Sequence, residues 1–189
     1  MIQVLRQHLT DRLGSQTEHL DTVLAYFEPM ETRRNAFLLQ TGDVCRHVYF
    51  VVRGCVQVFS VNAAGDEITR DIVFEGAWVS QLESFGQQLP ATESLRTPEP
   101  SQLLAISYPH FGQMMQTVPQ FAEIYRQILL LSFNNAVYRV NTLMGMDAAD
   151  RVRWLLDHQP NILTRLSSRL VASYLGITPE TLTRLKSKI

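Results

Sequence analysis

The 189-residue sequence has little cysteine and no long apolar run, and both absences exclude classes of protein. Cys45 and Cys55 are too few for a disulfide framework or a metal-ligand set, so we predict no metal site and interpret both as small apolar residues of strands. The apolar stretches, such as residues 128–131, are far shorter than the about 18 residues of a membrane span. The first residues are too often interrupted by polar ones to form a secretory signal. We therefore expect a cytoplasmic protein without a membrane partner.

Residue types that carry catalysis are equally scarce. A metal-dependent enzyme built on a barrel needs several histidines or carboxylates that converge, and only His47 lies in the region of predicted strands. Iron–sulfur sensing needs a cluster of cysteines. The sequence therefore predicts no catalytic residue, no cofactor and no enzyme.

Basic charge is concentrated at one end of the chain, although the net charge is only −1. Residues 1–146 carry ten arginines and fourteen acidic residues, which gives −4. Residues 147–189 carry five arginines, two lysines and four acidic residues, which gives +3. Both lysines, Lys186 and Lys188, lie among the last four residues. This distribution predicts that only the C-terminal part contacts phosphate.

Short strands separated by turns follow an N-terminal helical region. Leucines at helical spacing predict helices within residues 1–26, with a break at Gly14 and Ser15. Many short strands at near-regular spacing are typical of a sandwich or barrel. Strands are predicted at residues 36–39, 48–53, 55–61, 67–74, 92–97 and 102–107, with a hairpin turn at residues 62–66.

A long helix is predicted after these strands. Pro119 fits its first position, and the helical period continues to about Met146. A helix of about 27 residues is about 40 Å long, too long for a small barrel to cover, so we expect half of its apolar stripe to pack on a second copy. Asn134 and Asn135 interrupt the stripe, either as a buried amide that fixes the register or as solvent-facing groups. The predicted dimer residues are Phe121, Ile124, Ile128 and Leu131.

The C-terminal residues from Leu166 to Ile189 have the pattern of a helix-turn-helix, after a helix predicted from Ala148 to His158 with Asp147 as its cap. Two helices that cross steeply need a small residue where they meet, here Ala172. The turn needs a residue that tolerates positive φ, and Gly176 follows four residues later. Thr178 and Pro179 then suit the cap and first position of the second helix. Apolar side chains for the inner face are Val171, Leu175, Ile177, Leu182 and Leu185.

The second of these helices carries polar residues suited to DNA. A glutamate can accept from cytosine N4, and an arginine can bind guanine O6 and N7. Lysines near the C-terminal end of the helix suit phosphate contacts. The alternative is an amphipathic helix with a solvated polar face. The predicted DNA-binding residues are Thr178, Glu180, Thr181, Thr183, Arg184, Lys186 and Lys188.

The order of strand barrel, long helix and helix-turn-helix resembles the Crp/Fnr family of transcription regulators. The resemblance covers nearly the whole chain and is strongest at residues 49–79 and 172–189. It implies an α+β fold, with N-terminal helices and a cupin-like, cyclic-nucleotide-binding-like β-roll over residues 1–118, a dimerisation helix over 119–146 and a helix-turn-helix domain over 147–189. It also implies double-stranded DNA and a second copy as partners, with RNA polymerase as a further one.

Two departures from the family concern the DNA-binding end. The family's base-contacting glutamate and later arginine match Glu180 and Arg184, whereas its earlier arginine falls on Pro179. The sequence up to Ile189 leaves no room for a wing after the recognition helix. We therefore expect two of the three family base contacts.

Further departures concern the effector. Nucleotide-binding members use a glutamate in a Gly-Glu-Leu-Gly-like stretch and an Arg-Ser or Arg-Thr pair, but this chain has residues 76–79, Gly-Ala-Trp-Val, and the pair Ala91 and Thr92. A buried phosphate without its arginine lacks the charge-assisted bonds that offset desolvation, and Arg96 lies too far along the strand. We predict no cyclic-nucleotide binding. An apolar metabolite could instead be lined by Gly76, Trp78, Phe85 and Thr92, although core packing explains the two aromatic residues equally well.

The sequence therefore favours a dimeric, sequence-specific DNA-binding regulator. The alternative is a sensor or adaptor module whose C-terminal helices contact other proteins.

Overall fold

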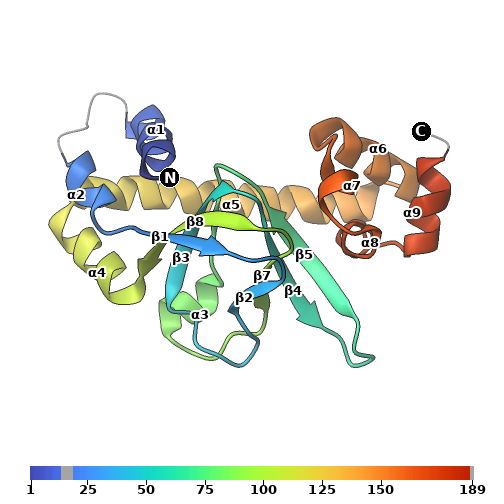
Figure 1. Cartoon of the computed structure of the whole chain (residues 1–189), viewed down its shortest axis with the longest axis horizontal. Coiled ribbons are helices and arrows are strands. Elements are labelled where there is room, and N and C mark those ends of the chain that lie inside the picture. The colour runs from blue at the N-terminus through green and yellow to red at the C-terminus, as the bar shows by residue number, and fades with distance from the viewer. Residues whose placement is uncertain (14–18, 188–189) are drawn as a thin grey trace.

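A single long helix, α5 (Pro119–Gly145), organises the molecule. In this computed structural model, which describes residues 1–13 and 19–187, α5 spans the length of the chain, with a β-roll along its middle (Figure 1). Helices α1, α2 and α4 lie at one end, and a C-terminal helical domain lies at the other. The predicted α+β architecture is confirmed. The predicted break at Gly14 and Ser15 lies outside the described residues.

The β-roll consists of two four-stranded antiparallel sheets with the strand orders β1–β8–β3–β6 and β2–β7–β4–β5. The strands predicted from the sequence are present, but the strand expected from Thr92 begins at Ser94. The bounds are β1 (Glu28–Thr32), β2 (Ala36–Leu39), β3 (His47–Arg53), β4 (Val56–Val61), β5 (Glu67–Val73), β6 (Trp78–Val79), β7 (Ser94–Thr97) and β8 (Ser101–Ser107).

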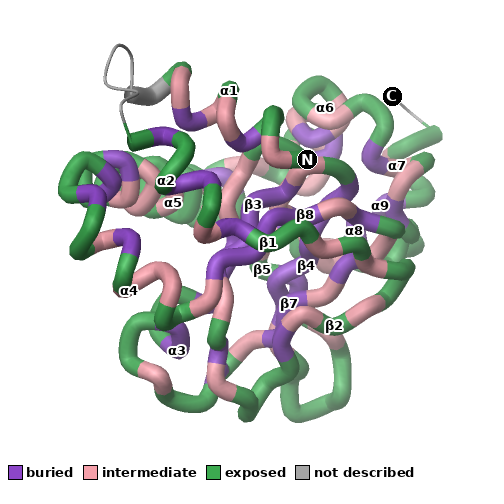
Figure 2. The backbone as a smooth tube through the Cα atoms, turned by 60° about the vertical axis from the view of Figure 1, so that its left-hand side comes forward, coloured by how far each residue is buried: buried purple, intermediate pink, exposed green. Residues whose placement is uncertain are grey.

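One apolar core joins both sheets and fills the roll. Val51 of β3 and Val56 of β4 are fully buried, as are Leu95 of β7 and Leu103 of β8. All four belong to one cluster of buried side chains, and the buried positions concentrate along these strands (Figure 2). The chain's own aliphatic side chains therefore occupy the interior of the roll.

The N-terminal helix α1 (Ile2–Leu13) covers the outer side of β3. Leu5 and Leu9 are fully buried there, and the His8 ring lies 4.7 Å from the Phe50 ring, measured between centroids. The indole nitrogen of Trp78 donates to His8 Nε2 at 3.0 Å. Because β3 is covered on both faces, its sequence is a nearly continuous apolar run. The other helices at this end are α2 (Leu20–Leu24) and α4 (Tyr108–Thr117), and α3 (Leu82–Gln87) lies between β6 and β7.

The C-terminal domain has a second core. Its helices are α6 (Ala148–His158), α7 (Ile162–Arg165), α8 (Ser168–Leu175) and α9 (Pro179–Lys186). Asp147 caps α6 as predicted, because its side chain accepts from the backbone N–H of Asp150 at 2.9 Å. The core of this domain also contains Cys55 and Ile72 from the β-roll. The domain is therefore packed against the roll.

Four elements, none of them predicted, lack the signal that sequence patterns rely on. β1 is an edge strand with Pro29 at its second residue, which only an edge tolerates, because proline cannot donate to a ladder. β6 has two residues and α7 has four, too few to show a period. The short α3 begins after Gln81, whose side chain serves as an unusual cap by accepting from the backbone N–H of Ser84.

Gly54 in the β3–β4 connection lies close to Ser101, and this close approach of two segments of the roll can be tested. Its φ is +88°, and an added Cβ would lie 2.2 Å from Ser101 Oγ and 2.9 Å from Ser101 Cα. We expect Gly54→Ala to lower the free energy of unfolding by about 2–5 kcal/mol, because strain and overlap add. Gly42→Ala is the matched control, since φ is +94° there but no atom lies within 4 Å of the added Cβ. Its expected cost is about 1–2 kcal/mol. Equal losses in the free energy of unfolding for the two variants, measured by urea unfolding, would contradict the close approach of Gly54 to Ser101.

Candidate nucleic-acid interface

The turn between α8 and α9 has the geometry predicted for a helix-turn-helix. Gly176 has φ +65°, and Ile177 N donates to Ala172 O at 3.1 Å, which ends α8 in a left-handed turn. Ala172 is fully buried where the helices cross. The predicted small residue and turn glycine are therefore confirmed.

The inner face of this unit packs as expected. Val171 and Leu175 of α8 and Leu182 of α9 are at most 1% exposed, while Ile177 and Leu185 are partly buried against the same cluster. A Cβ added at Gly176 would lie 3.4 Å from Leu143 Cδ2, so the turn also rests on the end of α5. Apolar packing thus fixes the orientation of α9 relative to α5.

The beginning of α9 is held by its cap. Thr178 Oγ1 accepts from Thr181 N at 3.2 Å, and Pro179 occupies the first turn, as predicted. Hydrogen bonds from its own backbone N–H and from the Thr178 hydroxyl lower the pKa of Glu180. The Glu180 carboxylate is exposed in the first turn of α9.

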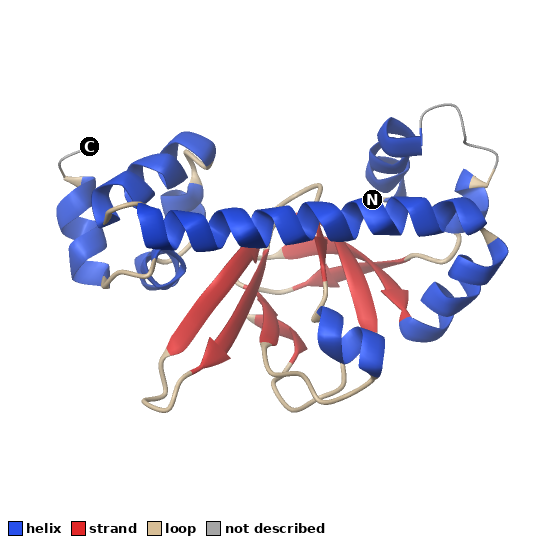
Figure 3. Cartoon of the chain, turned by 180° about the vertical axis from the view of Figure 1, so that it is seen from behind, coloured by secondary structure: helices blue, strands red, loops and turns tan. Residues whose placement is uncertain are grey.

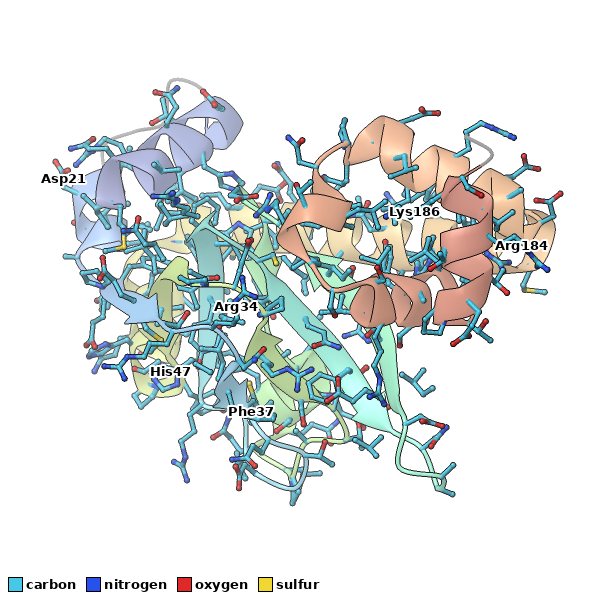
Figure 4. The ribbon with its side chains drawn as sticks, turned by 45° about the vertical axis from the view of Figure 1, so that its right-hand side comes forward. Asp21, Arg34, Phe37, His47, Arg184 and Lys186 are labelled. Carbon is cyan, nitrogen blue, oxygen red and sulfur yellow. The ribbon has the colours of Figure 1, made fainter. Side chains whose placement is uncertain are left out.

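Most of the predicted DNA-binding side chains share the outer surface of α9. Thr181 is half-buried, and the Thr183 hydroxyl donates to Pro179 O at 3.0 Å along the helix. Figure 4 shows Arg184 and Lys186 on α9, at the opposite end of the molecule from Asp21 of α2. Lys188 lies outside the described residues. The exposed members of the set are Thr178, Glu180, Thr183, Arg184 and Lys186.

The cations of the C-terminal domain divide into engaged and free groups. Arg151 donates to Leu143 O and Met146 O at the end of α5, and Arg153 pairs with Asp150 at 2.6 Å. Arg165 is held by carboxylates of the β-roll. Within the described residues, three arginine and lysine side chains of this domain are exposed and make no ion pair or hydrogen bond, namely Arg169, Arg184 and Lys186. All three belong to the helix-turn-helix.

Arg169 was not predicted from the sequence, although a signal exists. Ser167 caps α8 by accepting from Leu170 N, so Arg169 lies in the first turn of that helix. A cation there is repelled by the positive end of the helix dipole. Arg169 therefore does not stabilise the start of α8, and its charge is available for contact with an external anion.

The dimer residues predicted on α5 need correction. Phe121 and Ile124 are each 2% exposed and belong to the core shared with the β-roll, so they cannot face a second copy. Ile128 also packs against that core, whereas Leu131 is exposed. The sequence pattern identified an apolar stripe correctly, but this stripe is the one that covers the roll.

A second apolar stripe lies on the open side of α5. Figure 3 shows this helix crossing the front of the molecule with no element over its near side. The stripe residues alternate three and four positions apart, the spacing of a coiled-coil seam. Asn134 and Asn135 are exposed, so neither is a buried amide of this chain. The stripe consists of Leu130, Phe133, Val137, Val140 and Met144, with exposed fractions between 42% and 83%.

The four residues predicted to line a ligand pocket do not converge. Gly76 is exposed in a turn, where its N–H donates to Val51 O, and Thr92 is exposed as well. Trp78 packs outside the roll, under α1. The Phe85 ring lies 5.4 Å from the Phe111 ring of α4, between centroids. Core packing therefore accounts for both aromatic residues.

The positions expected to hold a cyclic phosphate do not fit that group. Ala91 is buried in a turn, and its N–H already donates to Asp43 O. Arg96 cannot substitute, because its neighbour Leu95 faces the core and successive strand residues point to opposite sides. The Arg96 guanidinium instead donates to Glu67 at 2.9 Å and Gln57 at 2.8 Å.

A polar cleft of about 490 Å³ lies elsewhere, where the C-terminal domain meets the roll. Arg165 of α7 lines it and pairs there with Glu75 at 2.7 Å and Glu99 at 2.6 Å. Gln102 Nε2 donates to Glu31 on the other side of the cleft. The single Arg165 cation therefore offsets only part of the negative charge that Glu75 and Glu99 bring to this cleft. Among residues 1–13 and 19–187, no group of three potential metal ligands is found.

Comparison with known proteins agrees with this architecture. Residues 29–118 match the cyclic nucleotide-binding domain family. The chain is 21% identical over 176 residues to the cAMP-activated global transcriptional regulator CRP of Haemophilus influenzae, covering 88% of this chain and 79% of that protein. It is 23% identical over 153 residues to the cAMP-activated global transcriptional regulator Vfr of Pseudomonas aeruginosa, covering 78% and 72%.

Solved structures share the fold at similar identity. The c-di-GMP responsive global regulator CLP of Xanthomonas campestris has a TM-score of 0.72 at 21% identity, covering 92% of this chain and 91% of that one. FixK2 of Bradyrhizobium japonicum has a TM-score of 0.73 at 16% identity, covering 86% and 83%. No helix in the described part of the chain is long and apolar enough to span a bilayer. Residues 29–118 thus match the cyclic nucleotide-binding domain family, and the sequence relatives over most of the chain are regulators rather than enzymes, so the chain is similar to transcription regulators of the Crp/Fnr type.

Proposed function

We propose that this protein is a homodimeric regulator that binds specific double-stranded DNA through α9 and acts without a cyclic nucleotide. The observation that carries the DNA-binding part is the distribution of cations. Within the described C-terminal domain, the exposed cations that make no contact in the chain are Arg169, Arg184 and Lys186, and all lie on the helix-turn-helix. Cations left unpaired on one small surface are what a phosphate backbone requires. A DNA partner implies a cytoplasmic location.

In this proposal α9 is the recognition helix. Glu180 and Arg184 lie four residues apart and so share one face, which enters the major groove. Arg184 is free to bind a guanine edge, and the exposed Glu180 carboxylate can accept from cytosine. Lys186, and Arg169 at the start of α8, suit phosphate contacts.

The open stripe of α5 is the proposed dimer interface. Two copies packed through Leu130, Phe133, Val137, Val140 and Met144 would form a short coiled coil along the two-fold axis. A two-fold dimer reads two half-sites about 10–10.5 base pairs apart, centre to centre, or a multiple of that distance. RNA polymerase is a further partner by analogy with the family.

The β-roll is proposed to lack a cyclic-nucleotide site. Its interior is filled by aliphatic side chains, Ala91 stands where the phosphate-binding arginine was expected, and Arg96 is committed to Glu67. The CRP and Vfr relatives are cAMP-activated regulators, so this chain would have kept the fold and lost that control.

Selection of bound duplexes from random oligonucleotides tests the DNA-binding proposal directly. Enrichment of a palindromic sequence, bound with a strong dependence on salt, is the expected result. No enriched sequence, and no salt-dependent binding to any duplex, would instead favour a sensor or adaptor that contacts proteins.

Two substitutions on α9 separate base reading from phosphate contact. Arg184→Ala should weaken binding to the selected sequence by about 1–3 kcal/mol and leave binding to random DNA nearly unchanged. Lys186→Ala should weaken both alike and reduce the salt slope by about one. Fluorescence titrations over a range of salt concentrations measure both effects. Unchanged discrimination in Arg184→Ala would remove the assigned recognition role.

A charge in the open stripe of α5 tests the dimer. Val137→Asp would place an unpaired carboxylate between two apolar helices, so we expect a folded monomer at micromolar concentration. Val61→Asp is the matched control, because Val61 is exposed on the β4–β5 hairpin, away from α5. Sedimentation velocity gives the mass of each. A wild-type monomer, or a dimer retained by Val137→Asp, would argue against this interface.

Calorimetric titration of the wild-type protein with cyclic AMP and cyclic GMP tests the effector proposal. We expect no heat of binding at micromolar concentrations of either nucleotide, because no described cation faces the interior of the roll to offset the desolvation of a phosphate. Micromolar affinity for either nucleotide would overturn this part of the proposal and leave the DNA-binding part intact.

A further inference from the structure

Helix α8 lies along an open strand edge of the β-roll. Strand β5 is last in its sheet, so the N–H and C=O groups on its outer side have no strand partner. Such an edge is a ready surface for another polar group. In this chain α8 packs against β5, which brings the first helix of the helix-turn-helix onto the roll.

A single hydroxyl joins the two parts. Ser173 Oγ of α8 accepts a hydrogen bond from Thr69 N at 2.9 Å and donates to Glu67 O at 2.8 Å. These are backbone groups of β5, two residues apart. One serine therefore takes the place of a neighbouring strand at this point of the edge.

A buried network fixes the position of that edge. Gln57 of β4 is 1% exposed, and its Nε2 donates to Thr69 Oγ1 at 2.9 Å. Arg96 of β7 donates to the Gln57 side-chain oxygen at 2.8 Å and to the Glu67 carboxylate. The two residues whose backbones bind Ser173 are thus also held through their side chains. Hydrogen bonds to a charged group in such a site are worth more than exposed ones.

Two further contacts hold the domain at other points. Arg165 of α7 donates to Glu75 and Glu99 of the roll at 2.7 and 2.6 Å. Bonds to these carboxylates, Glu99 first, raise the pKa of Arg165. The Arg139 guanidinium of α5 lies 3.9 Å from the centre of the Tyr174 ring of α8. Contacts at three separate places fix the orientation of a rigid body.

We propose that Ser173 is a positioning residue, which holds the helix-turn-helix on the edge of β5 so that the two recognition helices of a dimer stand at the spacing of two half-sites. This rests on the proposed function. Ser173 faces β5, and the base-reading candidates lie on α9. A fixed orientation lowers the ordering cost of engaging the second half-site, because the second contact becomes intramolecular. Ser173 is therefore expected to affect the affinity for a full site, and not the affinity for a single half-site.

The variant that tests this inference is Ser173→Ala, which removes only the hydroxyl and favours the helix. Thr164→Val is the matched control, because the exposed Thr164 hydroxyl of α7 bonds only within its own turn, to Asn161 O. Circular dichroism verifies that both variants fold. Hydrogen exchange then reports on the Thr69 amide, whose acceptor is the hydroxyl in question. We expect it to exchange about fivefold to tenfold faster in Ser173→Ala and at the wild-type rate in Thr164→Val.

DNA binding provides the second measurement. The probes are the palindromic duplex selected with the wild-type protein and the same duplex with one half-site scrambled. Ser173→Ala should bind the full site about threefold to tenfold more weakly and the scrambled duplex within about twofold of the wild type. Thr164→Val should match the wild type on both.

The outcomes separate the two proposals. An unchanged Thr69 exchange rate would show that the hydroxyl does not hold the edge, and equal losses on both duplexes would show that Ser173 acts on DNA contact rather than on spacing. Tighter binding of Ser173→Ala to the full site would mean that the Ser173 contact holds the domain away from its DNA-binding orientation, which also overturns a positioning role. If selection with the wild type enriches no sequence, the proposed function fails and positioning for half-sites fails with it, while exchange at Thr69 still decides whether the hydroxyl joins the two parts.

Discussion

The structure depends on one helix that carries apolar side chains on two sides. The 27 residues of α5 cover the β-roll with Phe121 and Ile124, carry an open stripe from Leu130 to Met144, and support the turn at Gly176 through Leu143. Helix α5 thus contacts both the roll and the C-terminal domain, which also contact each other directly. A rigid helix of this length transmits position between its ends, because bending it would break its backbone hydrogen bonds.

The strands and the helix-turn-helix could be predicted because local patterns determine them. Alternating or continuous apolar runs predicted most strands. The helix-turn-helix was predicted because Ala172, Gly176 and Thr178 are residue types that the turn requires at those positions. The dimer residues were wrong for Phe121 and Ile124 because a helix period shows that an apolar face exists and does not show what covers it. The open stripe has its own regular spacing. Because its residues are interleaved with those of the buried stripe, the sequence alone does not separate the two apolar faces of the helix. Arg169 was missed because an arginine in the first turn of a helix is unusual only when the first residue of that helix is known.

The candidate effector region illustrates the limit of reasoning by family position. The sequence suggested a pocket lined by Trp78 and Phe85, which are close to the positions that hold the nucleotide in nucleotide-binding members of the family, with core packing as the alternative. In the fold, Trp78 of β6 packs under α1 and Phe85 of α3 packs against α4. The contacts that could not be foreseen are those between residues far apart in the chain, such as Arg165 with Glu75 and Glu99.

The packing of α8 on β5 has a consequence for how the protein can be divided. Cys55 and Ile72 of the roll are buried by the C-terminal domain, and the edge of β5 is covered by it. A fragment ending within α5 would expose two apolar side chains next to an uncovered strand edge, which is the surface through which sheets of different molecules associate. The C-terminal domain therefore also covers a surface of the roll that would otherwise be prone to self-association, and the two parts are packed as a single unit.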